Sequence, residues 1–117
     1  MAKVFLVGCV RELMEEKNTV LQSGGYEVTL ATTLESACQA AKQQVFDLAI
    51  LEFSVPEKDR NQLARAIKSA HPNTKIIMLY FARPGHTEFA DVLLETSVRP
   101  EELLRSVNYI LTKSLED

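Results

Sequence analysis

The chain of 117 residues has a mass of 13.1 kDa, which fits one domain spanning residues 1–117 and leaves no room for a second. Its 46% apolar and 25% charged residues are typical of a globular protein and exclude a disordered, collagen-like or coiled-coil chain. The net charge of −3 argues against direct binding to nucleic acid, because such proteins carry a basic excess. Two cysteines, no secretory segment and no apolar run near the ~20 residues of a membrane span favour a soluble cytoplasmic protein.

Five short apolar runs alternate with amphipathic segments along the chain, which predicts a sheet between two layers of helices. Four of these runs are apolar on both faces and predict buried parallel strands. The second run alternates apolar with polar residues, which is typical of a strand at an edge or covered on one side. In chain order the five predicted strands are residues 4–7, 26–30, 48–51, 76–79 and 92–94.

The segments between these strands show helical periodicity and recognisable ends. The first predicted helix ends at residues 23–25, where two glycines suit a C-terminal cap. Thr32 and Glu35 have the spacing of a capping box and begin the second helix, and Asp59 is the expected N-cap of the third. Pro100, followed by two acids, begins the last helix. The residues expected to face the core are Leu13, Met14, Val20 and Leu21, then Leu34, Ala37, Cys38 and Ala41, then Leu63, Ala64, Ile67 and Ala70, and finally Leu103, Leu104, Val107, Ile110 and Leu111.

A further helix between the fourth and fifth strands is expected to be one turn or missing, because only residues 86–89 could turn helically. The alternation of strands and helices predicts an α/β fold with a doubly wound, five-stranded parallel sheet in the order 2-1-3-4-5. Ligands of such sheets bind outside the carboxyl ends of the strands, where the strand order reverses. The residues expected to line that crevice are Gly8, Cys9, Glu52, Tyr80, Phe81, Glu95, Thr96 and Ser97.

The chemistry available in this crevice is limited. Glu52 is a single carboxylate, whereas Mg²⁺ usually binds one or two carboxylates together with waters and phosphate. Cys9 lacks a neighbouring base, which favours a small buried side chain over a nucleophile. Cys38 lies on an apolar helix face, and His71 and His86 have no metal-ligand partner at useful spacing. We therefore expect no catalytic residue, no metal site and no cofactor.

The segment FDLAILEFSVPE, residues 46–57, resembles the phosphoacceptor region of response-regulator receiver domains, whose pattern is D-L-hydrophobic-hydrophobic-L-D-x-x-M-P. Residues 76–79 resemble the fourth strand of that family, and residues 90–94 with 100–104 resemble its fifth strand and last helix. The resemblance covers essentially the whole chain. It implies a flavodoxin-like receiver fold and a role in a two-component system or phosphorelay.

The resemblance also shows which site residues differ from the family pattern. Family members accept a phosphoryl group from a histidine kinase on an aspartate, assisted by Mg²⁺ that an acidic pair and the aspartate hold. A Thr or Ser and a Lys contact the phosphoryl oxygens. Here Gly8 and Cys9 stand in place of the acids, Glu52 in place of the aspartate, Tyr80 in place of the Thr or Ser, and Thr96 in place of the lysine. The loss of the whole set predicts a degenerate, or pseudo-, receiver domain without phosphotransfer.

The expected function is that of a phosphorylation-independent protein-interaction module, not an enzyme, whose partner is a protein of a signalling pathway; a homodimer is compatible with it. Glu52 either imitates the charge of a phosphoaspartate or is a solvated surface carboxylate. Tyr80, Phe81 and Phe89 either form a partner-docking patch or fill the space of the shortened helix. Two alternatives stay open: a conventional receiver phosphorylated at an unusual site, and a small α/β enzyme or ligand binder that uses the Cys9 thiol.

Overall fold

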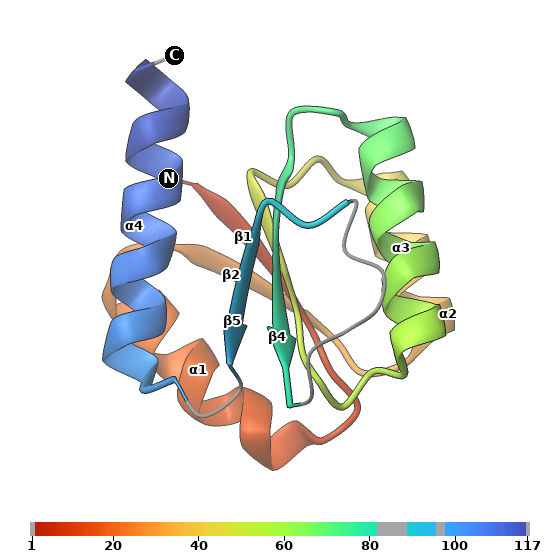
Figure 1. Cartoon of the computed structure of the whole chain (residues 1–117), viewed down its shortest axis with the longest axis horizontal. Coiled ribbons are helices and arrows are strands. Elements are labelled where there is room, and N and C mark those ends of the chain that lie inside the picture. The colour runs from red at the N-terminus through yellow and green to blue at the C-terminus, as the bar shows by residue number, and fades with distance from the viewer. Residues whose placement is uncertain (1, 82–88, 96–97, 117) are drawn as a thin grey trace.

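The computed structural model describes residues 2–81, 89–95 and 98–116, with side chains as far as residue 112. Its strands form one parallel sheet in the order β2-β1-β3-β4-β5 (Figure 1), which confirms the predicted α/β doubly wound topology. The predicted single turn at residues 86–89 lies, except for its last residue, outside the described part of the chain. The strands are β1 (Lys3–Val7), β2 (Glu27–Ala31), β3 (Leu48–Leu51), β4 (Lys75–Tyr80) and β5 (Val92–Glu95), and the described helices are α1 (Arg11–Ser23), α2 (Leu34–Gln43), α3 (Glu57–Ala70) and α4 (Pro100–Glu116).

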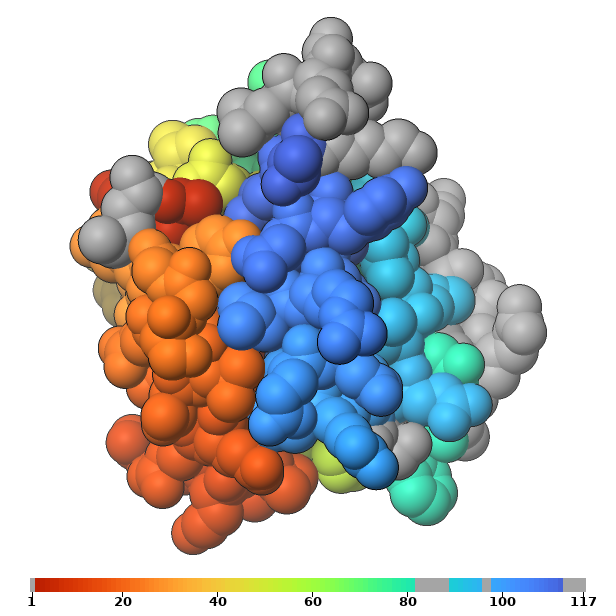
Figure 2. Space-filling model, turned by 90° about the vertical axis from the view of Figure 1, so that its left-hand side faces the viewer, coloured from red at the N-terminus to blue at the C-terminus, as the bar shows by residue number. Residues whose placement is uncertain are grey.

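Two layers of helices cover the two faces of the sheet. Helices α1 and α4 lie on one face and α2 and α3 on the other (Figure 1), and Figure 2 shows α1 and α4 packed side by side. Because side chains alternate along a strand, Phe5 and Val7 of β1 join the α2–α3 core, whereas Val4 and Leu6 join the α1–α4 core. Central strands must therefore be apolar on both faces, as the sequence predicted. No helix within the described ranges is long and apolar enough to cross a lipid bilayer.

Two helices begin at residues other than the predicted caps. The N-cap of α2 is Thr33, not Thr32, because Thr33 Oγ1 accepts a hydrogen bond from Ser36 N (3.0 Å) and Ser36 Oγ accepts one from Thr33 N (3.3 Å). Helix α3 begins after Pro56, whose φ of −53° already suits a helical entry. Asp59 therefore lies in the first turn of α3, where its charge favours the positive end of the helix dipole.

Two residues predicted to face the core are exposed. Leu13 in α1 is 40% exposed, and Ala70 at the end of α3 is exposed as well. The buried residues of α1 are Met14, Lys17 and Leu21, spaced three and four residues apart. The helix is thus rotated so that Leu13 lies beside the buried stripe and a lysine lies within it.

Candidate functional site

The ends of β1 and β3 lie side by side at the carboxyl edge of the sheet. Val7 and Leu51 form the last pair in the β1–β3 register, and Gly8 and Glu52 are the next residues in the chain. The backbone N–H of Glu52 donates to Val7 O (2.8 Å), and that of Cys9 donates to Ser54 Oγ (2.9 Å). Three of the predicted site residues, Gly8, Cys9 and Glu52, are therefore brought together.

The Glu52 side chain is fully buried, so the expectation of a solvated surface carboxylate is wrong. Its Oε1 atom forms an ion pair with Lys17 Nζ at 2.9 Å, and neither carboxylate oxygen has a further hydrogen-bond partner among the residues that the structure describes. The same ammonium donates a 3.3 Å hydrogen bond to Leu13 O, one turn earlier in α1. Burial raises the pKa of Glu52, and the neighbouring Lys17 opposes that rise. The position that corresponds to the phosphoacceptor aspartate of receiver domains thus holds a buried ion pair.

Lys17 was not among the residues predicted to line the crevice. Its ammonium group adds a positive charge at the carboxyl edge of the sheet that the sequence did not lead us to expect. The missed signal was its position, because Met14, Lys17 and Leu21 follow the i, i+3, i+7 spacing of a buried stripe. A cation on such a stripe requires a buried anion or carbonyl nearby. The partner, Glu52, is far away in the chain and became evident only from the fold.

Gly8 leaves no space for a side chain. A Cβ atom built on Gly8 would lie 3.0 Å from each of three atoms, which are Glu52 Cβ, Glu52 Cγ and Met14 Sδ. The longer side chain of Glu52 therefore occupies the space beside the glycine. An acidic residue at position 8 would require Glu52 or Met14 to move.

The residues at this edge do not fit the Mg²⁺ ion that the resemblance implies. Gly8 offers no side-chain ligand, and the Cys9 thiol is a soft ligand that suits Mg²⁺ poorly. Glu52 offers the only carboxylate of the matched positions, and an ammonium already contacts it. Among the side chains of residues 2–81, 89–95 and 98–112, no group of three or more His, Cys, Asp or Glu could hold a metal ion.

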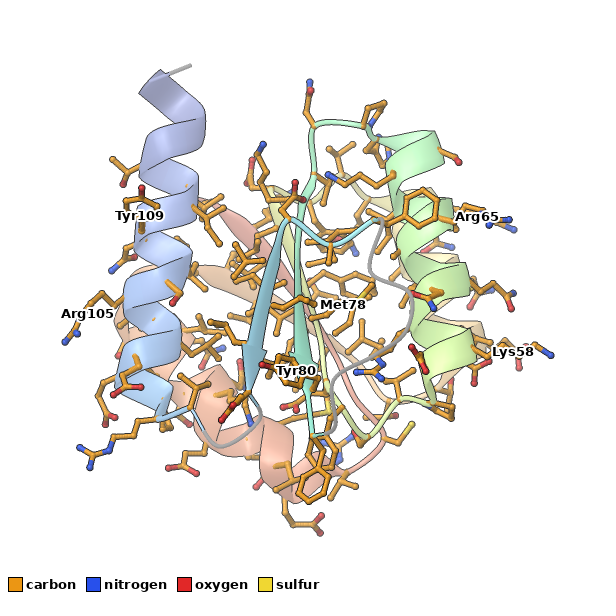
Figure 3. All side chains as sticks on the ribbon, viewed as in Figure 1. Lys58, Arg65, Met78, Tyr80, Arg105 and Tyr109 are labelled. Atoms are coloured by element: carbon orange, nitrogen blue, oxygen red, sulfur yellow. The ribbon has the colours of Figure 1, made fainter. Side chains whose placement is uncertain are left out.

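The remaining predicted pocket residues have different positions. Tyr80 ends β4 at the carboxyl edge and is half-buried (Figure 3). Thr96 and Ser97 lie outside the described residues. Cys9 is exposed rather than packed, because it lies in the β1–α1 connection beyond the edge of the sheet. Cys38 is half-buried against the α2–α3 core, as predicted.

The three aromatic residues proposed as a docking patch do not gather in one place. Phe81 is 81% exposed, and its ring centroid lies 6.2 Å from that of Phe53. Phe89 packs against the α2–α3 core near the amino end of β4, with the Arg65 guanidinium 5.6 Å above its ring. Tyr80 and Phe81 end β4 at the other edge, and Figure 3 shows Tyr80 and Arg65 at opposite ends of the sheet. Phe89 thus serves packing, and Phe81 remains available at the surface.

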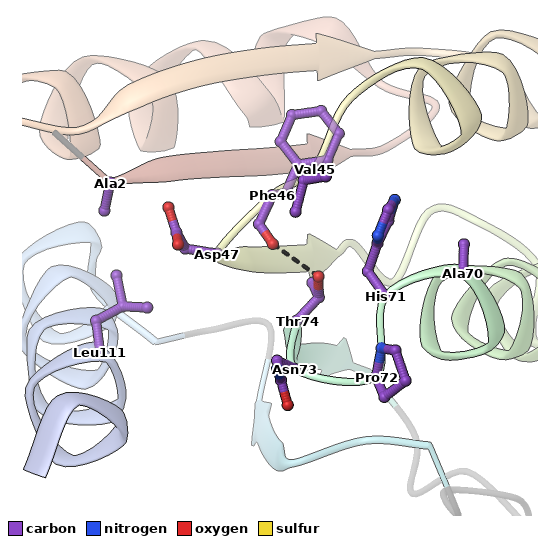
Figure 4. A pocket seen from close by; sticks show the side chains of 10 residues that line it. All are labelled: Ala2, Val45, Phe46, Asp47, Ala70, His71, Pro72, Asn73, Thr74 and Leu111. Atoms are coloured by element: carbon purple, nitrogen blue, oxygen red, sulfur yellow. Dashed lines mark hydrogen bonds between the residues drawn. The ribbon is translucent and has the colours of Figure 1, made fainter. Parts of the chain in front are cut away.

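A cavity of about 410 Å³ lies at the opposite, amino edge of the sheet (Figure 4). None of the predicted pocket residues lines it, although His71 does. Its Asp47 carboxylate accepts a hydrogen bond from Lys3 N (2.7 Å), and Thr74 Oγ1 donates one to Phe46 O (2.7 Å). These polar side chains therefore join the starts of neighbouring strands.

The raised pKa of Glu52 leads to a pH-dependent stability. The folded chain retains a proton on Glu52 above pH 4.5, the ordinary pKa, whereas the unfolded chain releases it. The contribution of Glu52 to stability is therefore complete at lower pH and is lost as the pH rises through the raised pKa. We expect the free energy of unfolding of the wild type to decline relative to Glu52→Gln over this interval, as measured by urea unfolding at successive pH values. Parallel profiles for the two proteins would contradict the expectation.

Comparisons with known proteins agree with this fold. No family model matches the sequence. The response regulator protein FleR of Pseudomonas aeruginosa is 30% identical over 78 residues, which are 67% of this chain and only 16% of that protein. A CheY-like response regulator receiver domain protein of Methanospirillum hungatei superposes with a TM-score of 0.90 at 20% identity, covering 99% of this chain and 98% of its own. The response regulator protein TrrA of Thermotoga maritima, solved in complex with Mg(2+)-BeF, gives a TM-score of 0.79 at 25% identity, covering 93% and 98%.

Proposed function

Since this chain belongs to the receiver domain family of two-component response regulators, we propose that it is a degenerate member that acts without aspartyl phosphorylation. In this proposal it is a protein-interaction module rather than an enzyme, and its partner is another protein of a signalling pathway. The observation that carries the proposal is the state of Glu52, whose carboxylate is fully buried and lies 2.9 Å from the Lys17 ammonium.

Burial of Glu52 argues against its use as a phosphoryl acceptor. An acceptor oxygen has to be reached in line by the phosphorus of the donor. The Glu52 side chain has no exposed surface, and its Oε1 already contacts Lys17. Its charge is also balanced inside the protein, so we do not assign it the role of a phosphoaspartate mimic exposed to a partner.

The missing cation site argues in the same direction. Charge that develops on a transferring phosphoryl group must be neutralised, usually by Mg²⁺ and a positioned cation. Gly8 and Cys9 cannot supply the carboxylates that would hold such an ion. The Lys17 ammonium is engaged with Glu52 and with a carbonyl of its own helix.

The alternative of a thiol-using enzyme receives limited support. Cys9 is exposed, so rapid alkylation of its thiol is expected whether or not the thiol has a catalytic role and does not distinguish this alternative from the proposed function. A nucleophilic cysteine also needs a base to activate it. His71 lines the cavity at the opposite edge of the sheet from Cys9, and His86 lies outside the described residues.

A phosphorylation assay tests the proposal directly. We expect the intact mass of the wild type to remain unchanged after incubation with acetyl phosphate and Mg²⁺, because the acceptor position is buried and has no metal site. A receiver domain with the full acidic set, treated in parallel, serves as the positive control.

The Glu52→Gln variant identifies the acceptor if a phosphate is added. Addition to the wild type but not to Glu52→Gln would make Glu52 the acceptor, and addition to both would favour an unusual site. Either result would overturn the proposed function.

A further inference from the structure

Two buried cations contact neighbouring strands just beyond the end of their shared ladder. The register of β3 with β4 ends at the pair Leu51–Met78. Glu52 follows Leu51 in the chain, and its carboxylate contacts the buried Lys17 ammonium. Leu79 follows Met78, and its carbonyl oxygen accepts a hydrogen bond from the buried Arg60 guanidinium. The two contacts thus begin where the backbone pairing of β3 and β4 stops.

The two cations come from helices on opposite faces of the sheet. Lys17 of α1 is 9% exposed and lies 2.9 Å from Glu52 Oε1. Arg60 of α3 is 7% exposed, and its Nη1 donates a 2.9 Å hydrogen bond to Leu79 O. The Nε of Arg60 has no hydrogen-bond partner within the described ranges. Each helix therefore contributes one charged group to one strand end.

An aromatic pair follows immediately after these contacts. Phe53 is the next residue after Glu52, and Phe81 comes two residues after Leu79. Their ring centroids are 6.2 Å apart, and Phe81 is 81% exposed. The exposed aromatic surface at the carboxyl edge is therefore carried by two backbone segments that buried cations hold.

We propose that Lys17 and Arg60 are positioning residues that hold the ends of β3 and β4, and with them the Phe53–Phe81 pair, in a single arrangement without a bound metal ion or phosphoryl group. This inference rests on the proposed function, because it explains how a domain that is never phosphorylated keeps the carboxyl edge of its sheet in one conformation.

The strength of the two contacts follows from charge and burial. Hydrogen bonds with an ionised partner are about twice as strong as neutral ones. Removing a cation from a buried oxygen leaves that oxygen without a compensating partner, which is unfavourable in a low dielectric. Because Lys17 and Arg60 approach from opposite faces, a displacement of either strand end breaks one of the two contacts.

NMR relaxation dispersion at the Phe53 and Phe81 amides tests this inference, because it detects exchange on the microsecond to millisecond scale. We expect the wild-type amides to show no exchange and no shift on addition of Mg²⁺ with beryllofluoride. Lys17→Met should introduce exchange at Phe53, and Arg60→Met should introduce it at Phe81. Arg60→Lys, which retains a cation able to donate to Leu79 O, should restore the wild-type behaviour at Phe81.

A matched control separates positioning from general loss of stability. Val107→Ala removes buried side-chain volume from α4 without touching either cation, and we expect it to leave both amides free of exchange. The inference would be overturned by any of three results at the Phe53 and Phe81 amides: no exchange in either Met variant, exchange in Val107→Ala, or exchange in the wild type. The comparison of the Met variants with Val107→Ala is made without Mg²⁺ or beryllofluoride, so its failure would overturn this inference and leave the proposed function standing. A phosphate added in the phosphorylation assay would refute the proposed function, and a shift of the wild-type amides with Mg²⁺ and beryllofluoride would overturn both.

Discussion

Replacement of Lys17 by methionine is expected to lower the free energy of unfolding by about 3 kcal/mol at neutral pH. Methionine retains an apolar chain of similar length, so the change isolates the loss of the ammonium. Glu52, which has no exposed surface, would then carry a buried carboxylate without a cation. The loss should diminish as the pH falls, because a protonated Glu52 no longer requires a positive partner.

A double-mutant cycle measured by urea unfolding checks this expectation. The variant with both Lys17→Met and Glu52→Met should recover most of the lost stability, since replacing both members of a buried ion pair by apolar residues is often neutral or favourable. An equal effect of Lys17→Met in the presence and absence of Glu52 would contradict it. That result would mean that Lys17 contributes only through the packing of its aliphatic chain.

Replacement of Gly8 by aspartate, the residue type expected there in an active receiver, is expected to destabilise the protein by about 3–4 kcal/mol or to prevent folding. The new Cβ would lie 3.0 Å from two atoms of Glu52 and from Met14 Sδ. The new carboxylate would also stand next to the Glu52 carboxylate, and two like charges at one buried site oppose each other. Thermal and urea unfolding measure the combined effect.

Two further variants separate the steric effect from the effect of charge. Gly8→Ala tests the close contacts alone and is expected to destabilise by about 1–2 kcal/mol. Combining Gly8→Asp with Glu52→Ala removes one of the close contacts and the competing charge, and should recover part of the stability. A neutral Gly8→Ala would contradict the steric part of the prediction, because it would show that Glu52 and Met14 make room for a Cβ atom at position 8.

Most of the fold was predictable because the relevant signals are local. The four runs that are apolar on both faces, together with the helical segments between them, were sufficient for a parallel sheet in the order 2-1-3-4-5. Three of these runs are buried as predicted, in β1, β3 and β4, whereas β5 is only half-buried because it lies at an edge of the sheet. The helix starts were less predictable. Thr32 and Thr33 are both suitable caps, and the choice of Thr33 depends on a hydrogen bond that Ser36 returns to the backbone.

The candidate site was only partly predictable. Gly8, Cys9 and Glu52 come together because residues that follow neighbouring parallel strands meet at one edge of a sheet. The burial of Glu52 was not predictable in this way, since a carboxylate after a strand is more often solvated. The roles of Lys17 and Arg60 were also missed, because each depends on how its helix is rotated against the sheet.

The strand order and the proximity of Gly8 to Glu52 thus follow from the pattern of apolar residues along the chain. That pattern determines which segments form parallel strands and which form the helical crossover connections between them. The charge state of the edge is decided in three dimensions. Lys17 and Glu52 are distant in sequence, and their attraction depends on a 2.9 Å separation and on the exclusion of water. Neither quantity exists until α1 has packed against the sheet. Only then does Lys17, a charged residue within an otherwise apolar helical stripe, become the counter-ion of the buried Glu52 carboxylate.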